Sequence, residues 1–294
     1  MKIAIFGQQF HHSTQESLEI LFECLDDYKA EIYLEPEFAN FIGKKFNQLS
    51  KKFACESFEN IDSSFDLLVS IGGDGTILRA ITHVKTSGVP IVGINTGRLG
   101  FLATIQTSVI KSAFEDIFNK NYKISERSLV SVTTNPVHEA MVNINFALNE
   151  VAVSRKNTTS MISVDTHLND EYLTSYWADG LIIATPTGST GYSLSCGGPV
   201  ITPQAGNFVI TPIAPHNLNA RPLVIPDSTS IQLKVNGRED DFLLSLDSRL
   251  FTLTNDTVVT VKRANFKINM VELNSESFLN TLRKKLLWGE DRRN

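Results

Sequence analysis

The stretch LLVSIGGDGTILRA, Leu67 to Ala80, decides the fold of the first half of the chain. An apolar run over residues 67–71 ends in glycines, and Ile77 and Ile81 then follow at the i, i+4 spacing of a helix. A strand, a glycine turn and a helix in this order are typical of a phosphate-binding crossover in an α/β sheet. The stretch therefore predicts a parallel sheet with a ligand site at its carboxyl edge.

The glycine turn has a carboxylate at its centre, because Gly72, Gly73 and Gly75 surround Asp74. The glycines allow close approach of a phosphate to the backbone, but no G-K-[ST] follows, so the turn is not a P-loop. Asp74 can accept the proton of a hydroxyl that attacks phosphorus, hold magnesium, or only hydrogen-bond the turn. The local sequence does not choose among these roles. Arg79, one turn into the helix, is the nearest cation in the sequence.

Around this stretch, residues 1–125 alternate strand and helix patterns. Fully apolar runs suit strands of a parallel sheet that is covered on both faces. The runs are KIAIF, EIYL, DLLVSI and VPIVGI. Helical spacing is shown by Leu18, Leu21, Phe22 and Leu25, and again by Ile110, Phe114, Ile117 and Phe118. We predict a doubly wound α/β domain with a mostly parallel sheet over residues 1–125.

The pattern changes near residue 126. Short segments rich in Val, Ile and Thr follow one another, separated by Asn, Asp, Gly and Pro, as in INFALNEVAVS, SMISVDTHL and TVVTVKR. This predicts a mostly antiparallel, β-rich domain over residues 126–270. The segment SESFLNTLRKKLLWG is helical again, and we expect residues 271–294 to form a helix that packs back on the first domain.

Composition excludes several classes of protein. The 294 residues carry a net charge of −5, which argues against a nucleic-acid partner. The three cysteines, Cys24, Cys55 and Cys196, form no C-x-x-C pair and indicate neither a disulfide framework nor a zinc site. No apolar window approaches the ~18 residues of a membrane span. We expect a cytoplasmic protein with no membrane partner.

Three further clusters contain candidate ligand groups. NTGRLGFL, residues 95–102, follows a predicted strand, where α/β sheets keep their ligand crevice, although a structural turn fits equally well. Asn149 and Glu150 offer hydrogen-bonding groups for a ribose or an amino group, or form a polar pair at a strand end.

The densest cluster is ADGLIIATPTGSTGYSLSCGGP, residues 178–199, with many hydroxyls and one stacking ring, Tyr192, close together. We interpret it as a loop for a polar, sugar-like ligand. The spacing G-x-S-x-G of serine hydrolases is missing, and we interpret His216 as a structural hydrogen-bonding residue.

Taken in order, GGDGTIL, NTGRLGFL, LNEVAV, DGLIIATPTGSTGYSLSCGGP and PHNLNARPL resemble the NAD kinase family over residues 66–226. The resemblance implies transfer of the γ-phosphoryl group of ATP to the 2′-hydroxyl of the adenosine ribose of NAD, with magnesium or another divalent ion. It implies Asp74 as the base, and homodimers or homotetramers. The residues it places at the dinucleotide are Asp74, Gly75, Arg79, Asn149, Glu150, Asp179, Thr187, Thr190, Gly191, Tyr192, Ser193, Leu194, Ser195 and Ala214.

Two positions depart from the family pattern. Trp177 stands where many members have a basic residue, two positions before Asp179. Ser248 follows Asp247 where many members have an Asp-Gly pair, which puts ligand contacts there in doubt. The sequence does not identify metal ligands, and it does not decide between NAD and NADH, between ATP and polyphosphate, or whether NADPH inhibits.

Two other functions share some of these features. GGDGT also occurs in diacylglycerol and sphingosine kinases, so a lipid kinase is one alternative, although no membrane-facing surface is evident. A non-catalytic NAD(P) sensor is the other. The presence of Asp74 together with Asn149 and Glu150 argues against a sensor.

Overall fold

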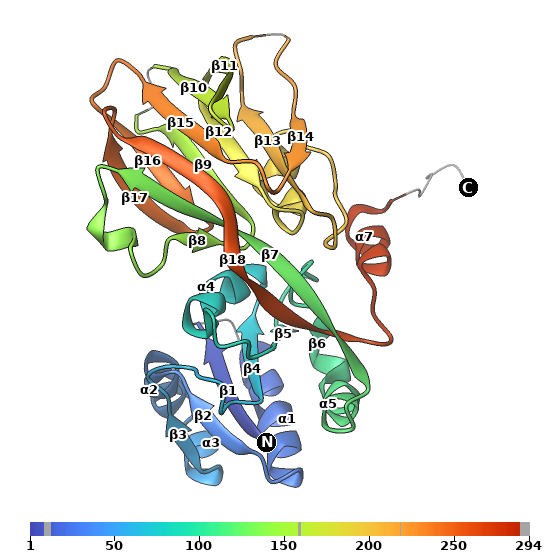
Figure 1. The fold of residues 1–294 in the computed structure, drawn as a ribbon. Coiled ribbons are helices and arrows are strands. Elements are labelled where there is room, and N and C mark those ends of the chain that lie inside the picture. The colour runs from blue at the N-terminus through green and yellow to red at the C-terminus, as the bar shows by residue number, and fades with distance from the viewer. Residues whose placement is uncertain (9–12, 158–159, 218, 289–294) are drawn as a thin grey trace. The chain divides into compact units, whose positions relative to one another are not determined.

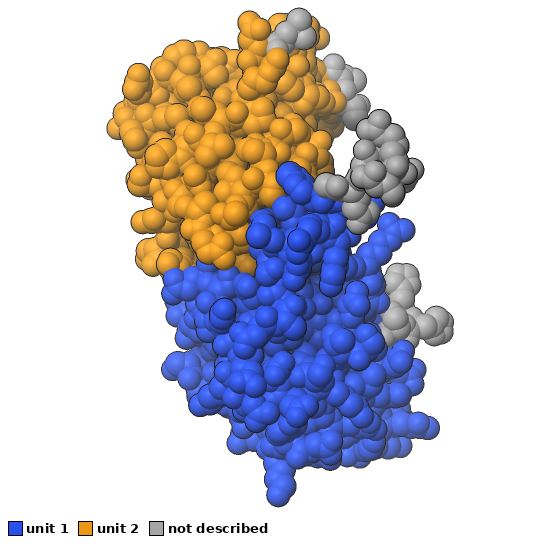
Figure 2. Space-filling view, turned by 90° about the vertical axis from the view of Figure 1, so that its right-hand side faces the viewer, with its two compact units in different colours: residues 1–126, 268–294 blue, residues 127–267 orange. Residues whose placement is uncertain are grey.

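The computed structural model describes residues 1–8, 13–157, 160–217 and 219–288. The chain divides into two compact units, coloured in Figure 2. Unit 1 contains residues 1–126 and 268–294, and unit 2 contains residues 127–267. The chain leaves unit 1 within strand β7 (Tyr122–Asn135) and returns within strand β18 (Val258–Leu273).

Unit 1 contains a parallel sheet with the order β3-β2-β1-β4-β5. Its strands are β1 (Lys2–Gly7), β2 (Glu31–Leu34), β3 (Cys55–Ser57), β4 (Leu67–Gly72) and β5 (Ile91–Asn95), and the short β6 (Ile105–Gln106) pairs with β5. The order reverses between β1 and β4. In open α/β sheets, ligands bind outside the carboxyl ends of the strands at such a switch point. The glycine turn follows β4 directly (Figure 1).

Helices cover both faces of this sheet. Ile3 and Ile5 of β1 are fully buried in the same cluster as Leu18 of α1 and Phe114 of α5. On the other face, the Phe6 ring lies 5.0 Å from that of His83 in α4. The helices are α1 (Ser13–Asp27), α2 (Pro36–Lys45), α3 (Asn47–Lys52), α4 (Asp74–Val84) and α5 (Ile110–Phe118), with the 3₁₀ turn η1 (Thr107–Val109) before α5. The predicted doubly wound fold is confirmed.

Helices α2 and α3 were not predicted. Their start can be explained from the sequence, because Pro36 stands at the first helical position and the Glu35 carboxylate accepts the Phe38 N–H at 2.8 Å. The predicted C-terminal helix is α7 (Phe278–Leu286), and it belongs to unit 1 as expected. Ser277 caps it by accepting the Asn280 N–H at 3.2 Å.

Unit 2 is an antiparallel β-sandwich. One sheet has the order β14-β13-β12-β9-β16-β17, and the other contains β11-β10-β15 and the first part of β18, with β7 and β8. Val153 of β9 and Val164 of β10 are fully buried in one cluster, so both sheets contribute to one core. The strands are β8 (Phe146–Ala147), β9 (Glu150–Arg155), β10 (Ile162–Leu168), β11 (Glu171–Ala178), β12 (Gly180–Ala184), β13 (Asn207–Ile213), β14 (Leu223–Pro226), β15 (Ile231–Asn236), β16 (Asp241–Leu246) and β17 (Arg249–Thr254). The predicted β-rich second domain is confirmed.

Unit 2 also has three short helical turns. They are η2 (Glu139–Met141), η3 (Gly188–Thr190) and α6 (Tyr192–Ser195). The last two lie in the hydroxyl-rich segment after β12, so that segment is a compact turn structure rather than an open loop.

Candidate active site

The glycine turn places Asp74 at the first position of helix α4. Gly72 has φ of 151°, a conformation that L side chains rarely adopt, and Gly73 is the extended residue that precedes the helix. A negative side chain in the first helical turn is stabilised by the helix dipole. The position of the carboxylate among the glycines is therefore favourable for the fold itself.

Three consecutive backbone N–H groups bind the Asp74 carboxylate. Phe101 donates to Oδ2 at 2.8 Å, and Leu102 and Ala103 donate to Oδ1 at 3.0 and 2.9 Å. A Cβ atom on Gly100 would lie 1.9 Å from Oδ1, so this segment approaches closely only with glycine there. A carboxylate has about four acceptor positions. One position, on Oδ2, remains for a further donor.

Asn95 shapes the segment that holds Asp74. Its amide donates to the Arg98 carbonyl at 2.7 Å and to the Ala103 carbonyl at 3.1 Å, and its Oδ1 accepts the Gly97 N–H at 2.7 Å. Of the two alternatives for NTGRLGFL, the structure shows the structural turn, and this turn positions the Asp74 carboxylate. A contact between this segment and a ligand stays a prediction.

Two cations of unit 1 lie near the turn. The Lys285 ammonium of α7 lies 3.9 Å from Asp74 Oδ2 and 4.9 Å from the centre of the Phe101 ring. Arg79 instead faces Gln8 at the end of β1. With the Gln8 amide oriented by its partners, its oxygen accepts from Arg79 Nε at 3.0 Å and Nη1 at 2.6 Å. Sequence reasoning missed Lys285, because its contact with Asp74 depends on the return of the chain to unit 1.

In unit 2, Asp247 fixes the backbone of the Asn149–Glu150 pair. Its fully buried carboxylate accepts N–H groups from Leu148 at 2.9 Å, Asn149 at 2.8 Å and Glu150 at 3.2 Å. Asp247 has φ of 52° in the turn between β16 and β17, and Arg249 Nη2 lies 3.8 Å from it. The carboxylate keeps these contacts although Ser248 replaces the usual glycine.

Three predicted site residues of unit 2 have buried oxygens without hydrogen-bond partners. They are Asn149 Oδ1, Glu150 Oε2 and Thr187 Oγ1. A Cβ atom on Gly191 would lie 3.2 Å from Glu150 Oε2 and 3.3 Å from Asn149 Nδ2, so the turn after β12 packs against this pair. Buried polar atoms are nearly always paired. Asn149 and Glu150 meet at Gly191, so their unpartnered oxygens are candidates for hydrogen bonds to a ligand.

Burial raises the pKa of Glu150 to about 8, and the charge of Asp247 adds to this effect, while the Tyr192 N–H opposes it. Burial also raises the pKa of Asp247, but three N–H groups and Arg249 oppose that shift. Glu150, with a pKa of about 8, is therefore mostly protonated near neutral pH. A protonated Glu150 can donate a hydrogen bond to a ligand.

A pH dependence of stability follows. Above pH 4.5 the unfolded chain has an ionised Glu150, whereas the folded protein keeps it protonated up to a pKa of about 8, so folding stability is lost as pH rises between these values. We expect Glu150→Gln to raise the melting temperature of the ligand-free protein little at about pH 5 and most at about pH 8–9. Thermal unfolding at a series of pH values from about 5 to 9 measures this change in melting temperature. Glu171→Gln, at an exposed position, is the matched control. A gain that does not grow with pH contradicts a protonated Glu150.

Most hydroxyls in the segment after β12 are used inside unit 2. Thr185 Oγ1 donates to the Leu148 carbonyl at 2.5 Å, and Ser189 Oγ donates to the Pro186 carbonyl at 2.6 Å. The Ser193 hydroxyl, fully buried, lies 2.8 Å from that of Thr211. These bonds make the turn rigid. The remaining predicted residues are at least partly accessible: Thr190, Gly191, Tyr192, Leu194 and Ser195.

Asp179 and Ala214 lie at adjacent ends of β12 and β13. The Asp179 N–H donates to the Ile213 carbonyl at 3.0 Å, directly before Ala214, which has a left-handed φ of 44°. The Asp179 carboxylate accepts from Arg155 Nη2 at 2.9 Å. The structure thus brings these two predicted residues together within unit 2.

Comparisons with known proteins identify the family of the chain. Residues 3–122 match the ATP-NAD kinase N-terminal domain, and residues 148–273 match the ATP-NAD kinase C-terminal domain. The chain belongs to the ATP-NAD kinase family. It is 58% identical over 295 residues to an NAD kinase of Christiangramia forsetii and 56% identical over 296 residues to one of Flavobacterium johnsoniae, with 100% of each chain covered.

Two solved structures are also similar to this ATP-NAD kinase chain. A yeast NADH kinase complexed with NADH has a TM-score of 0.86 at 24% identity, over 99% of this chain and 88% of that one. An NAD kinase from Archaeoglobus fulgidus in complex with ATP has a TM-score of 0.74 at 27% identity, over 98% and 99%. The fold assignment is therefore that of the family. No comparison supports a lipid kinase.

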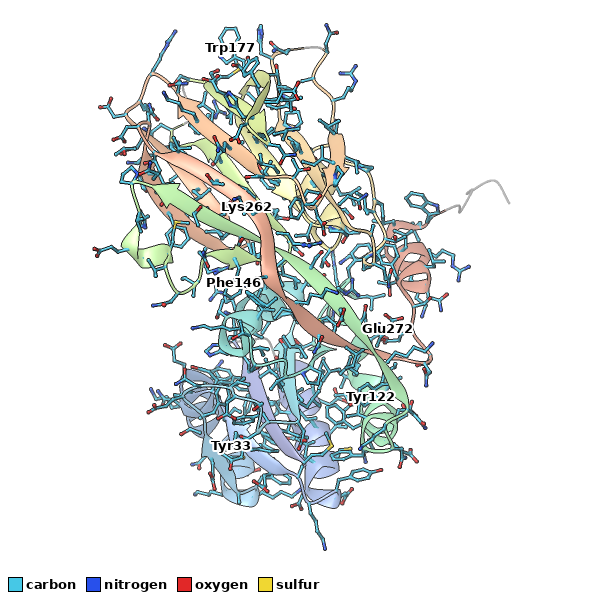
Figure 3. All side chains as sticks on the ribbon, viewed as in Figure 1. Tyr33, Tyr122, Phe146, Trp177, Lys262 and Glu272 are labelled. Carbon is cyan, nitrogen blue, oxygen red and sulfur yellow. The ribbon has the colours of Figure 1, made fainter. Side chains whose placement is uncertain are left out.

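One departure from the family pattern now has a structural explanation. Trp177 projects from β11 with its ring about half exposed (Figure 3), and the ring centre lies 4.9 Å from that of His216. The position two residues before Asp179 is thus aromatic in this ATP-NAD kinase. The cation beside Asp179 comes from Arg155 of β9 instead.

No helix in the part of the chain that the structure describes is both long enough and apolar enough to cross a bilayer.

Proposed function

We propose that this ATP-NAD kinase transfers the γ-phosphoryl group of ATP to the 2′-hydroxyl of the adenosine ribose of NAD, with Asp74 as the general base. One observation carries the assignment of the base. The Asp74 carboxylate is held by three N–H groups and keeps one acceptor position, on Oδ2. A rigidly held carboxylate with one accessible position is what proton abstraction from a hydroxyl requires.

The proton of the 2′-hydroxyl moves to Asp74 Oδ2, the hydroxyl oxygen forms a bond to the γ-phosphorus, and the bond from that phosphorus to the β–γ bridging oxygen breaks, with its electron pair leaving on ADP. The unpartnered oxygens of Asn149, Glu150 and Thr187 support unit 2 as the holder of the dinucleotide. A positioned base contributes ~10²–10⁴-fold, and positioning of the reactants contributes much of the remainder.

Magnesium or another divalent ion belongs to this proposal. The described residues contain no cluster of three or more His, Cys, Asp and Glu side chains placed to hold a metal ion. Magnesium commonly binds through substrate phosphates, waters and one or two carboxylates. The surroundings of Asp74 therefore fit an ion that arrives with the phosphates of ATP, with Asp74 as the neighbouring carboxylate. When bound, the ion neutralises charge on the phosphates.

The proposal also includes a homodimer or homotetramer in the cytoplasm. Two aromatic side chains, Tyr172 and Trp177, are exposed on β11, which is an edge strand of its sheet. An uncovered edge strand with exposed aromatic side chains favours association. Sedimentation analysis of the purified protein measures the number of copies.

The test of the function is a coupled assay. ATP, magnesium and NAD are incubated with the protein, and NADP is detected with glucose-6-phosphate dehydrogenase. We expect NADP to form. Parallel reactions with NADH, followed by a direct assay for NADPH, and with polyphosphate identify the accepted substrates. If calorimetry detects NAD binding but no reaction yields product, the chain is a sensor and the proposed kinase activity is wrong.

A further inference from the structure

A phosphoryl group that approaches Asp74 meets a negative charge. A catalytic base must be anionic, and the transferred phosphoryl group is anionic too, so the two repel unless a cation stands beside them. Arg79, the nearest cation in the sequence, is turned toward the Gln8 amide. The cation that the fold brings to Asp74 is Lys285.

The distance between Lys285 and Asp74 leaves the Lys285 ammonium available to a ligand. Lys285 Nζ is 3.9 Å from Asp74 Oδ2, which is too long for a hydrogen bond. The ammonium carries three donors. Both side chains are partly exposed, 34% for Lys285 and 28% for Asp74, so a ligand can reach them.

Helix α7 is anchored to the segment that holds Asp74. The Thr104 hydroxyl donates to the Glu276 carboxylate at 2.5 Å, and the Phe278 ring lies 6.3 Å from that of Phe101. Lys285 itself lies over the Phe101 ring, and the Phe101 N–H donates to Asp74. The ammonium is therefore placed by the same segment that places the base.

A role in stability alone does not account for this arrangement. A partly exposed ion pair without a hydrogen bond contributes little to folding stability. Removal of the charge should therefore change stability little, whereas removal of a cation that contacts the reacting group should change the rate.

We propose that Lys285 is a catalytic residue that donates hydrogen bonds to the transferred phosphoryl group beside Asp74. This inference rests on the proposed function. The lysine keeps its protons throughout: the 2′-hydroxyl proton goes to Asp74, and the leaving electron pair goes to ADP. Lys285 thus supplies the cation that the glycine turn itself lacks.

The test compares Lys285→Met, Lys285→Arg and, as the matched control, Lys284→Met. Lys284 is next to Lys285 on α7 but lines a cavity of about 400 Å³ together with Thr281. We expect Lys285→Met to lower kcat about 100-fold, as for loss of one donor to a developing charge, with little change in KM for NAD. Lys285→Arg should restore at least a tenth of kcat, since it keeps the charge. Lys284→Met should stay within about twofold of the parent protein.

The results separate this inference from the proposed function. If the parent protein makes no NADP, the proposed function fails. If it makes NADP and Lys285→Met retains kcat within about threefold, a difference of less than 1 kcal/mol, only the role of Lys285 is overturned. Thermal unfolding should show nearly equal melting temperatures for all variants. If Lys285→Met does not fold, Lys285→Gln and Lys285→Arg are compared, and equal kcat for these two overturns the role.

Discussion

Asp74→Asn is expected to lower kcat about 10³-fold, because the variant has no carboxylate to take the proton of the ribose hydroxyl. The structure adds a second consequence. Both carboxylate oxygens accept N–H groups, so an amide must turn its NH₂ toward at least one of these donors. Because Asp74 is only partly buried, this mismatch should cost about 1 kcal/mol of folding stability, at the low end of the range for a buried donor that loses its acceptor. Stopped assays for NADP and thermal unfolding measure the two effects.

Loss of the base in Asp74→Asn must be distinguished from loss of the fold. NAD binding to Asp74→Asn by calorimetry should stay within about threefold of the parent protein, since asparagine keeps the size and an acceptor oxygen of Asp74, and the predicted binding groups of unit 2 are untouched. Asp66→Asn is the matched control, because Asp66 lies directly before the same strand β4 and its carboxylate accepts the Lys2 N–H, at 2.7 Å. Full activity of a folded Asp74→Asn would end the assignment of Asp74 as the base.

Asp247→Ala is expected to destabilise unit 2 by about 3–5 kcal/mol, because it removes one partner from a buried charged network. Three N–H groups, of Leu148, Asn149 and Glu150, lose their acceptor, and Arg249 loses its counter-ion. The segment that presents Asn149 and Glu150 then loses three of the hydrogen bonds that hold it in place. NAD affinity should fall at least about tenfold, or 1.4 kcal/mol.

Denaturant unfolding and calorimetry with NAD measure these losses. Asp240→Ala is the matched control, because its side chain is exposed in the same unit. A folded Asp247→Ala protein with unchanged NAD affinity would show that the hydrogen bonds to Asp247 are not needed for binding. Calorimetry at a temperature below the melting transition measures the NAD affinity of the folded variant, so affinity and folding stability are measured separately.

The sequence predicted both folds because strong local patterns decide them. The apolar run and glycine turn at residues 67–75 specify a parallel strand and its crossover helix, and the Val, Ile and Thr segments of unit 2 specify antiparallel strands. Helices α2 and α3 were missed, since their sequence, PEFANFIGKKFNQLSKK, has a short and interrupted apolar stripe.

The sequence identified candidate residues of the site, but it did not identify the groups that hold those residues in place. The motifs identify Asp74, Asn149 and Glu150, which stay predictions until tested. The groups that hydrogen-bond to these residues are distant in sequence. The Ala103 N–H is 29 residues from Asp74, and Asp247 is 98 residues from Asn149. Such contacts depend on tertiary packing, which local spacing does not encode. The hydroxyl-rich segment 178–199 predicted a ligand loop, but packing engages the hydroxyls of Thr185 and Ser193 within the unit.

The link between Asp247 and Asn149 also has a consequence for biosynthesis. A ribosome adds ~5–20 residues per second, so the 98 residues between the two positions correspond to about 5–20 s of translation. Throughout that interval the N–H groups of residues 148–150 have no acceptor from this carboxylate. In a nascent chain, residues 148–150, which we propose bind the dinucleotide, thus complete these hydrogen bonds only after the turn between β16 and β17 has emerged. We expect slow codons just before residue 247 to prolong exposure of the segment to chaperones and proteases.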